Sequence, residues 1–236
     1  MPLIKHKNKM KILCVSDQID PLVYSSNIKE RYKDIDLVIS AGDLPMEYLD
    51  FIVSSLNKPV LFVFGNHNLS EFGLYHNTQS SSDVIEKARG LGLNKLNTHG
   101  ATYIGFKTHK EGSLLIAGVS GSLNYNNGLN QYTDMQMRFK LMRMIPVLIW
   151  NKLRYGRYLD ILVTHASPLG IHDKPDPCHK GFACFLWFIE KFSPKFLIHG
   201  HIHLYDLQDI RVSTFLKTTV INAYSHYILD TGEQKK

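Results

Sequence analysis

Two histidines follow a glycine at the end of an apolar run near residue 200. The run Phe196 to His199 indicates a short buried strand, and Gly200 lets the backbone turn before His201 and His203. If the backbone stays extended, both imidazoles point to the same side. Neutral imidazoles two residues apart at the mouth of a strand can hold metal ions. The alternative is a chance cluster in a chain with 12 histidines.

Polar residues also follow four apolar runs upstream, and these favour the metal hypothesis. They are Asp17, Asp43, the pair Asn66 and His67, and His165. In parallel α/β sheets, ligands collect outside the carboxyl ends of the strands, so we expect these side chains to meet His201 and His203. Carboxylate, amide oxygen and imidazole together suit Mn, Fe or Zn better than Ca.

The elements that must position these residues follow from periodicity. Buried strands are predicted over residues 10–16, 36–40, 60–64, 158–163 and 196–199, with shorter candidates at 101–106 and 113–119. Helices are predicted over 24–32, 45–56, 133–155 and 181–192, and Pro146 should kink or split the third. Residues 69–82 and 118–128 are expected to be loops, Asp83 to cap a short helix to Arg89, and 205–229 to form two or three antiparallel strands. This alternation indicates an α/β protein with parallel strands.

Length and composition indicate an ordinary globular protein. At 236 residues and 27.0 kDa, with 44% hydrophobic residues, the chain is expected to form a single domain over residues 1–236. Cys14, Cys178 and Cys184 form no CxxC pair, and this suggests a reducing compartment. With neither a signal peptide nor an apolar run of about 20 residues, we expect a cytoplasmic protein with no membrane partner.

The charge balance favours anionic ligands. The net charge is +6 and the pI about 9.1, which suits phosphate esters through long-range attraction. No aromatic–basic motif of an RNA-binding domain is present, so a nucleic-acid partner is not expected. The sequence does not indicate an oligomeric state.

The motifs in order, Asp, Gly-Asp, Gly-Asn-His, His and Gly-His-x-His, resemble those of the calcineurin-like metallophosphoesterase superfamily. The resemblance runs from Lys11 to about Tyr205. Each motif alone is weak, but the ordered set is specific. The resemblance implies a two-sheet α/β/β/α sandwich of the metallo-dependent phosphatase type, with two divalent metal ions and a small phosphoester substrate.

By the same resemblance, Asp43 bridges the two ions. Asn66, His165 and His201 complete one metal site, while Asp17 and His203 belong to the other. His67 matches the general acid, and the nucleophile would be a metal-bound hydroxide that attacks a phosphomonoester or phosphodiester in line.

The chain departs from the family pattern at Ile19, where the family has a metal-binding histidine. Asp20 could supply a replacement ligand, or it could be a turn residue before Pro21. The combination Ser-Asp-x-x-Asp-Pro resembles a bacterial subgroup of the superfamily. Asn68 stands where the family usually has an acidic residue, and we expect it to support the loop.

Two further function hypotheses remain open beside the phosphoesterase. The first is a catalytically weak or inactive scaffold of the same fold that binds proteins, which Ile19 favours. The second is a nuclease, which would need a long basic groove. Substrate-binding residues are not identified, although His172 and His179 follow His165 in a turn-rich loop that could shape a pocket. His199 is expected to be a core histidine, and Cys14 and Trp187 core residues.

Overall fold

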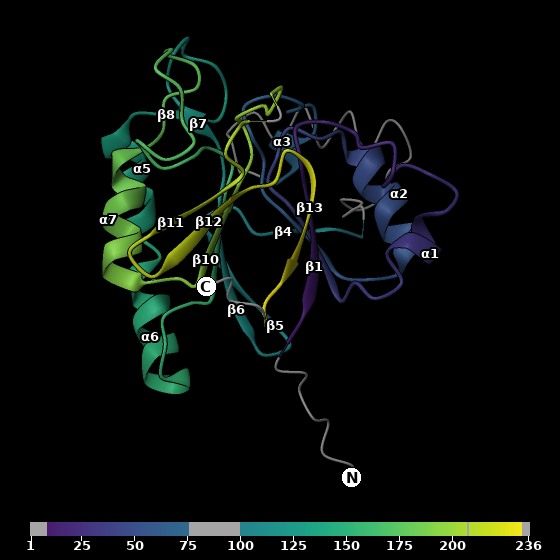
Figure 1. Ribbon diagram of the computed structural model, residues 1–236. Coiled ribbons are helices and arrows are strands. Elements are labelled where there is room, and N and C mark those ends of the chain that lie inside the picture. Colours follow the sequence, from purple (N-terminus) through teal and green to yellow (C-terminus); the bar gives the residue numbers. More distant parts are fainter. Residues whose placement is uncertain (1–8, 76–99, 207, 233–236) are drawn as a thin grey trace.

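The computed structural model describes residues 9–75, 100–206 and 208–232. Its first sheet has the strand order β13-β1-β2-β3-β4. The bounds are β1 Lys11–Ser16, β2 Leu37–Ser40, β3 Val60–Phe62, β4 Thr102–Tyr103 and β13 Ser225–Asp230. Strands β1 to β4 run parallel, and β13 pairs antiparallel with β1. The loops after β1, β2 and β3 therefore share one edge of the sheet (Figure 1).

The second sheet has the order β11-β12-β10-β9-β6-β5. The bounds are β5 Lys107–Glu111, β6 Leu114–Val119, β9 Ile161–Thr164, β10 Phe196–His199, β11 Val212–Phe215 and β12 Thr218–Asn222. Its four inner strands are parallel, and β5 and β11 pair antiparallel at the two edges. A small pair, β7 (Ser122–Leu123) and β8 (Gln131–Tyr132), lies above the loop edge.

The two sheets face each other across an apolar layer, and strand alternation decides which side chains enter it. In β1, Ile12 and Cys14 pack in this layer, while Leu13 and Val15 face the opposite side. Both faces of each sheet are thus buried, which explains why the inner strands read as continuous apolar runs.

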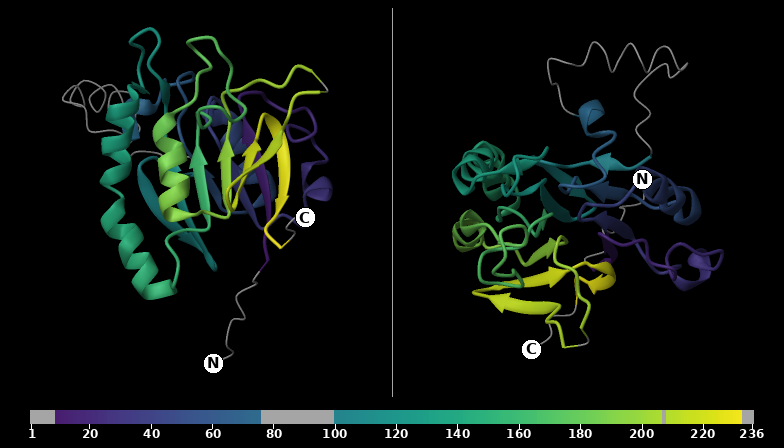
Figure 2. Two further views of the ribbon diagram at one scale, coloured as in Figure 1. Left: turned by 60° about the vertical axis from the view of Figure 1, so that its left-hand side comes forward. Right: turned by 90° about the horizontal axis from the view of Figure 1, so that it is seen from above.

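Helices cover the outer faces of the sandwich. Helices α1 (Ile28–Arg31) and α2 (Met46–Leu56) pack on the first sheet, and α5 (Asp134–Met142), α6 (Ile145–Tyr155) and α7 (Ala183–Phe192) on the second. Figure 2 shows the two groups on opposite sides. Thr133 begins α5 with a capping box to Gln136. Gly156 ends α6 in the left-handed conformation.

The predicted sandwich is confirmed, and so is the split at Pro146, which stands in the first turn of α6. Several details of the prediction were wrong. Helix α1 starts at Ile28 rather than Tyr24, α3 (Phe72–Tyr75) and β7 form inside the predicted loops 69–82 and 118–128, and β5 was missed. The sequence of β5, KTHKE, is that of a charged edge strand without an apolar run. The predicted helix 83–89 lies outside the described residues.

Aromatic side chains of α7 pack against the second sheet. We expect this layer to contribute strongly to the free energy of unfolding. Phe185 is fully buried, whereas Phe139 on α5 is 56% exposed. We expect Phe185→Ala to lower the free energy of unfolding by about 3–5 kcal/mol through a cavity and lost burial. The matched change Phe139→Ala should alter it by less than about 0.5 kcal/mol. Urea unfolding of both variants checks this, and equal effects would contradict the assigned layer.

Candidate metal centre

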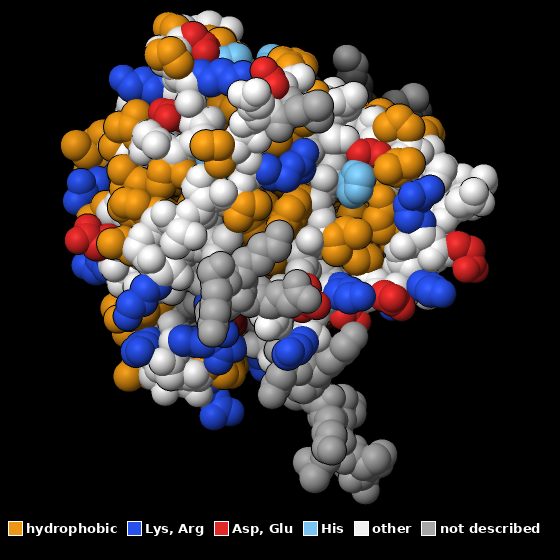
Figure 3. All heavy atoms as spheres, viewed as in Figure 1, with side chains coloured by type: hydrophobic (Ala, Val, Ile, Leu, Met, Phe, Trp, Pro, Cys, Tyr) orange, Lys and Arg blue, Asp and Glu red, His pale blue; other side chains and the backbone are white. Residues whose placement is uncertain are grey.

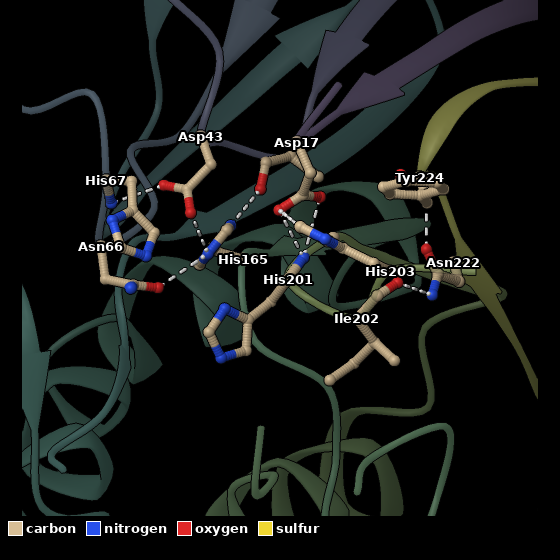
Figure 4. A network of polar contacts seen from close by, with 12 residues as sticks. Asp17, Asp43, Asn66, His67, His165, His201, Ile202, His203, Asn222 and Tyr224 are labelled. Atoms are coloured by element: carbon tan, nitrogen blue, oxygen red, sulfur yellow. Dashed lines mark hydrogen bonds and ion pairs between the residues drawn. The ribbon is translucent and has the colours of Figure 1, made fainter. Parts of the chain in front are cut away.

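The predicted site residues all leave the sheets at one edge. Asp17 follows β1, Asp43 lies beyond β2, Asn66 and His67 lie beyond β3, His165 follows β9, and His201 and His203 lie beyond β10. Figure 4 shows these side chains gathered between the ends of the two sheets. Parallel strand order brings together groups that are far apart in the sequence, such as Asp17 and the main chain of His201, which are 184 positions apart.

Four of these residues form a tight, buried group. His165 Nε2 lies 3.2 Å from Asp43 Oδ2 and 3.1 Å from Asn66 Oδ1. One ligand atom from each of Asp43, His165 and His201 lies within 4.8 Å of the others. All four residues are buried, so these polar atoms need partners inside the protein.

Main-chain carbonyls fix which ring nitrogens are available. His165 Nδ1 donates to the carbonyl of Ala41 at 2.8 Å, and His201 Nε2 donates to that of Cys178 at 2.6 Å. A carbonyl only accepts, so the neutral rings keep lone pairs on His165 Nε2 and His201 Nδ1. Histidines that bind metals are held in this way. The Asn66 amide nitrogen donates to the Tyr125 hydroxyl at 3.2 Å, which leaves Asn66 Oδ1 toward the site.

Lone pairs on His165 Nε2, Asp43 Oδ2 and Asn66 Oδ1 therefore face one another. Such acceptors repel unless a proton or a cation lies among them. Burial opposes ionisation of Asp43 and protonation of His165, but their mutual attraction outweighs it. The pKa of Asp43 is accordingly lowered and that of His165 raised. The donor set of carboxylate, amide oxygen and imidazole fits a divalent transition metal.

The other predicted pair, Asp17 and His203, is looser. The Asp17 carboxylate accepts from the main-chain N–H of His201 at 2.9 and 3.0 Å, and His203 Nε2 lies 3.9 Å from Asp17 Oδ1. Burial raises the pKa of Asp17 to about 6, and the charge of Asp43 adds to this effect. A buried carboxylate whose charge is disfavoured by burial and by a second carboxylate also indicates a cation position.

Three of these residues have a strained backbone. Asp17, Asp43 and His201 have φ values of 63°, 56° and 66°, a region that side chains other than glycine seldom occupy. The condition of an extended backbone at His201 is therefore not met, because the chain turns there after Gly200. Ile202, only 2% exposed, is buried between the two histidines instead.

The glycines of the motifs are required by close packing against the ligands. A Cβ atom on Gly65 would lie 2.0 Å from Asp43 Oδ1, and one on Gly200 would lie 2.5 Å from Asp17 Oδ2. Gly42 approaches His165 Nδ1 in the same way, with a φ of 102°. The loop beyond β7 adds support that the sequence did not reveal, since the Asn130 amide donates to the Gly65 carbonyl at 2.6 Å.

His67 lies beside this group. Its main-chain N–H donates to Asp43 Oδ1 at 2.7 Å, and its residue is exposed at the mouth of the site (Figure 4). The Asn68 side chain donates to the main-chain carbonyl of Asp43 at 2.9 Å. Asn68 thus ties the β3 loop to the β2 loop, which is the supporting role expected for it.

Neither Ile19 nor Asp20 supplies the metal ligand that the family's histidine would provide. Ile19 is 42% exposed. Asp20 accepts from the main-chain N–H of Leu22 at 2.7 Å, from Ser225 Oγ and from His226 Nδ1. Its carboxylate oxygens are thus engaged in a turn and in β13, and this favours the turn interpretation of Asp20.

Three further histidines, His172, His179 and His199, lie near the centre. His199 is fully buried, and its ring contacts His172 at 2.8 Å, which in turn contacts Ser213. His172 also borders a cavity of about 610 Å³ next to Ile202. His179 pairs with Asp176, and its ring lies 5.5 Å from that of His201. The carbonyl of Cys178, which orients His201, had no signal in the sequence.

Comparisons with known proteins agree with this geometry. A family model described as calcineurin-like phosphoesterase matches residues 10–205. The chain belongs to this family. A comparison with curated proteins gives no match.

The fold of this member of the family is also similar to solved structures. One crystal structure aligns over 96% of this chain and 97% of its own, with a TM-score of 0.64 and 14% identity. TT1561 of Thermus thermophilus aligns over 92% of this chain and 89% of its own, with a TM-score of 0.54 and 12% identity. At sequence identities this low, similarity to these structures establishes the fold alone. Within the described residues, no helix has the length and apolar character needed to cross a membrane.

Because Gly65 leaves no room for a side chain, its substitution should damage the centre directly. We expect Gly65→Ala to displace Asp43 and to weaken Mn²⁺ binding by at least about tenfold, as loss of ligand positioning does in metal sites. Gly73→Ala is the control, since a Cβ atom there meets nothing within 4 Å. Calorimetric titration with Mn²⁺ compares the two, and equal affinities would contradict the assigned packing.

A cation that enters this group must displace a proton from His165. The raised pKa of His165 keeps its ring protonated at pH 7, so metal binding should release about one proton per chain there. At pH well above that raised pKa the release should disappear. Calorimetry in two buffers of different ionisation enthalpy measures the proton count. No release at pH 7 would contradict the assigned protonation.

Proposed function

We propose that this protein hydrolyses a small phosphomonoester or phosphodiester with the help of two divalent ions of the Mn, Fe or Zn type. The observation that carries the proposal is the convergence of ligand atoms from Asp43, Asn66 and His165 at one buried point. Family membership supports phosphoester hydrolysis in general terms. When bound, such ions neutralise phosphoryl charge and activate water as a nucleophile.

The chain's own residues would divide the remaining work. Asp43, at the junction of the two ligand groups, would hold both ions, with Asn66, His165 and His201 on one side and Asp17 and His203 on the other. The carbonyls of Ala41 and Cys178 keep His165 and His201 in the tautomers that metal binding needs. The two sheets fix these groups before substrate binds, so little reorganisation accompanies the reaction.

His67 is the proposed general acid. Its main chain is anchored to Asp43, while its residue is exposed where a substrate would enter. From there the imidazole can donate a proton to the leaving oxygen. The basic character of the chain, with a net charge of +6, favours approach of an anionic ester.

Replacing His67 should separate chemistry from metal binding. We expect His67→Gln to lower kcat by about 10²–10⁴-fold with unchanged metal content, because a proton donor but no ligand is lost. Asp43→Asn should lose both metal and activity. His109→Gln serves as the control, since His109 lies on the edge strand β5 beside Glu111. Hydrolysis of aryl phosphomonoesters and diesters, with elemental analysis of each variant, provides the readout.

A protein-binding scaffold of the same fold is the second candidate. Ile19 favours it, because an exposed apolar residue stands where the family has an imidazole ligand. Leu22 and Tyr24 nearby are also exposed, by 45% and 54%. If the metal-loaded protein hydrolyses no ester in the panel, and Asp43→Asn behaves like the parent, the scaffold replaces the enzyme as the conclusion.

A further inference from the structure

The outer face of the helix pair α5–α6 carries apolar side chains where a surface helix usually carries polar ones. In α5, Met137 and Leu141 are buried against the second sheet, and in α6, Leu148 and Asn151 are buried. On the sides turned away from these lie apolar residues that are 44% to 77% exposed: Met135, Phe139, Met142, Ile149, Trp150 and Leu153. We call these six residues the outer apolar face.

The spacing of these residues makes two continuous stripes. At about 100° per residue, positions 135, 139 and 142 lie together on α5, and positions 149, 150 and 153 lie together on α6. Both stripes point away from the core, in contrast to an ordinary amphipathic helix. An apolar surface of this kind marks a site of interaction rather than a surface made for water.

Cations flank both stripes. Arg138 and Lys140 border the α5 stripe, and Lys152 and Arg154 border the α6 stripe. With Arg143, residues 134–155 hold five cations, and their single acidic residue is Asp134. Figure 3 shows orange side chains with blue ones among them along the margin that α5, α6 and α7 form.

Neighbouring groups hold several of these cations beside the stripes. The Arg138 guanidinium lies 4.9 Å from the Trp187 ring, and Lys140 Nζ lies 4.5 Å from that of Phe106. Lys152 Nζ donates to the carbonyl of Gly156 at 2.9 Å. The cations therefore lie beside the outer apolar face and leave its apolar side chains exposed to solvent.

We propose that the outer apolar face docks on the surface of an anionic lipid membrane. Tryptophan, phenylalanine, leucine and methionine tips would enter the boundary between head groups and acyl chains, while the flanking cations contact phosphate groups. A second copy of the chain fits less well, because a twofold interface would set five cations against five. This docking is independent of the proposed hydrolysis.

Peripheral docking also revises the expectation that the protein has no membrane partner. The absence of a predicted membrane-spanning segment does not bear on binding at the membrane surface. A helix pair that lies flat on a membrane needs neither great length nor uniform apolarity. In this arrangement the basic residues of 133–155 would contact the lipid head groups.

Vesicle sedimentation with the full chain tests the proposal. We expect binding to vesicles of phosphatidylcholine with phosphatidylglycerol, little binding to phosphatidylcholine alone, and weaker binding at high salt. The double variant Trp150→Ser with Leu153→Ser should bind at least about tenfold more weakly, and so should Lys152→Glu with Arg154→Glu. Leu216→Ser is the matched control, because Leu216 is 63% exposed at the turn between β11 and β12.

Several outcomes would overturn the proposal. They are no sedimentation with anionic vesicles, equal binding to neutral vesicles, and parent-like binding by both double variants. Light scattering that shows a dimer lost in the Trp150→Ser, Leu153→Ser variant would assign the face to a second copy instead. Circular dichroism and thermal unfolding of each variant confirm that the chain still folds, since the substituted side chains lie on the surface.

Discussion

The structure is organised around buried carboxylate, amide and imidazole groups whose acceptor atoms face one another at one point. Asp17, Asp43, Asn66 and His165 come from four different strand ends, and burial removes the water that would otherwise solvate them. Gathering such groups costs free energy unless a positive charge balances them. In the metal-free chain the proton on His165 serves this purpose. A divalent ion would do so more fully, because several ligands share its charge.

The backbone is strained where it brings these groups together. Non-glycine residues in left-handed conformations are unfavourable by about 1–3 kcal/mol each, and Asp17, Asp43 and His201 all adopt them. The strain brings the carboxylates and the His201 main chain into one place. The glycines at 42, 65 and 200 then allow the strand ends to approach without a clash. Stability is supplied elsewhere, by the apolar layers between and outside the two sheets.

Most of the candidate site residues could be predicted from the sequence, because they lie directly after the strands. Where Asp, Asn or His follows an apolar run, the rule that ligands collect at the carboxyl ends of parallel strands predicts that these side chains lie close together. The fate of Asp20 could not be read, since its partners Ser225 and His226 are 205 and 206 positions away and meet it only through β13. The orientation of His201 likewise depends on a main-chain carbonyl, that of Cys178, whose position no side-chain pattern encodes. On α5 and α6, apolar residues that point outward cannot be told from core residues until the packing is known.

Diffraction from crystals loaded with Mn²⁺ tests the metal centre most directly, because anomalous scattering locates each ion. Two peaks close together are expected. One would lie among Asp43, Asn66, His165 and His201, and the other beside Asp17 and His203. A map without a peak at Asp43, or with density only at the nearby group Asp176, Cys178 and His179, would contradict it.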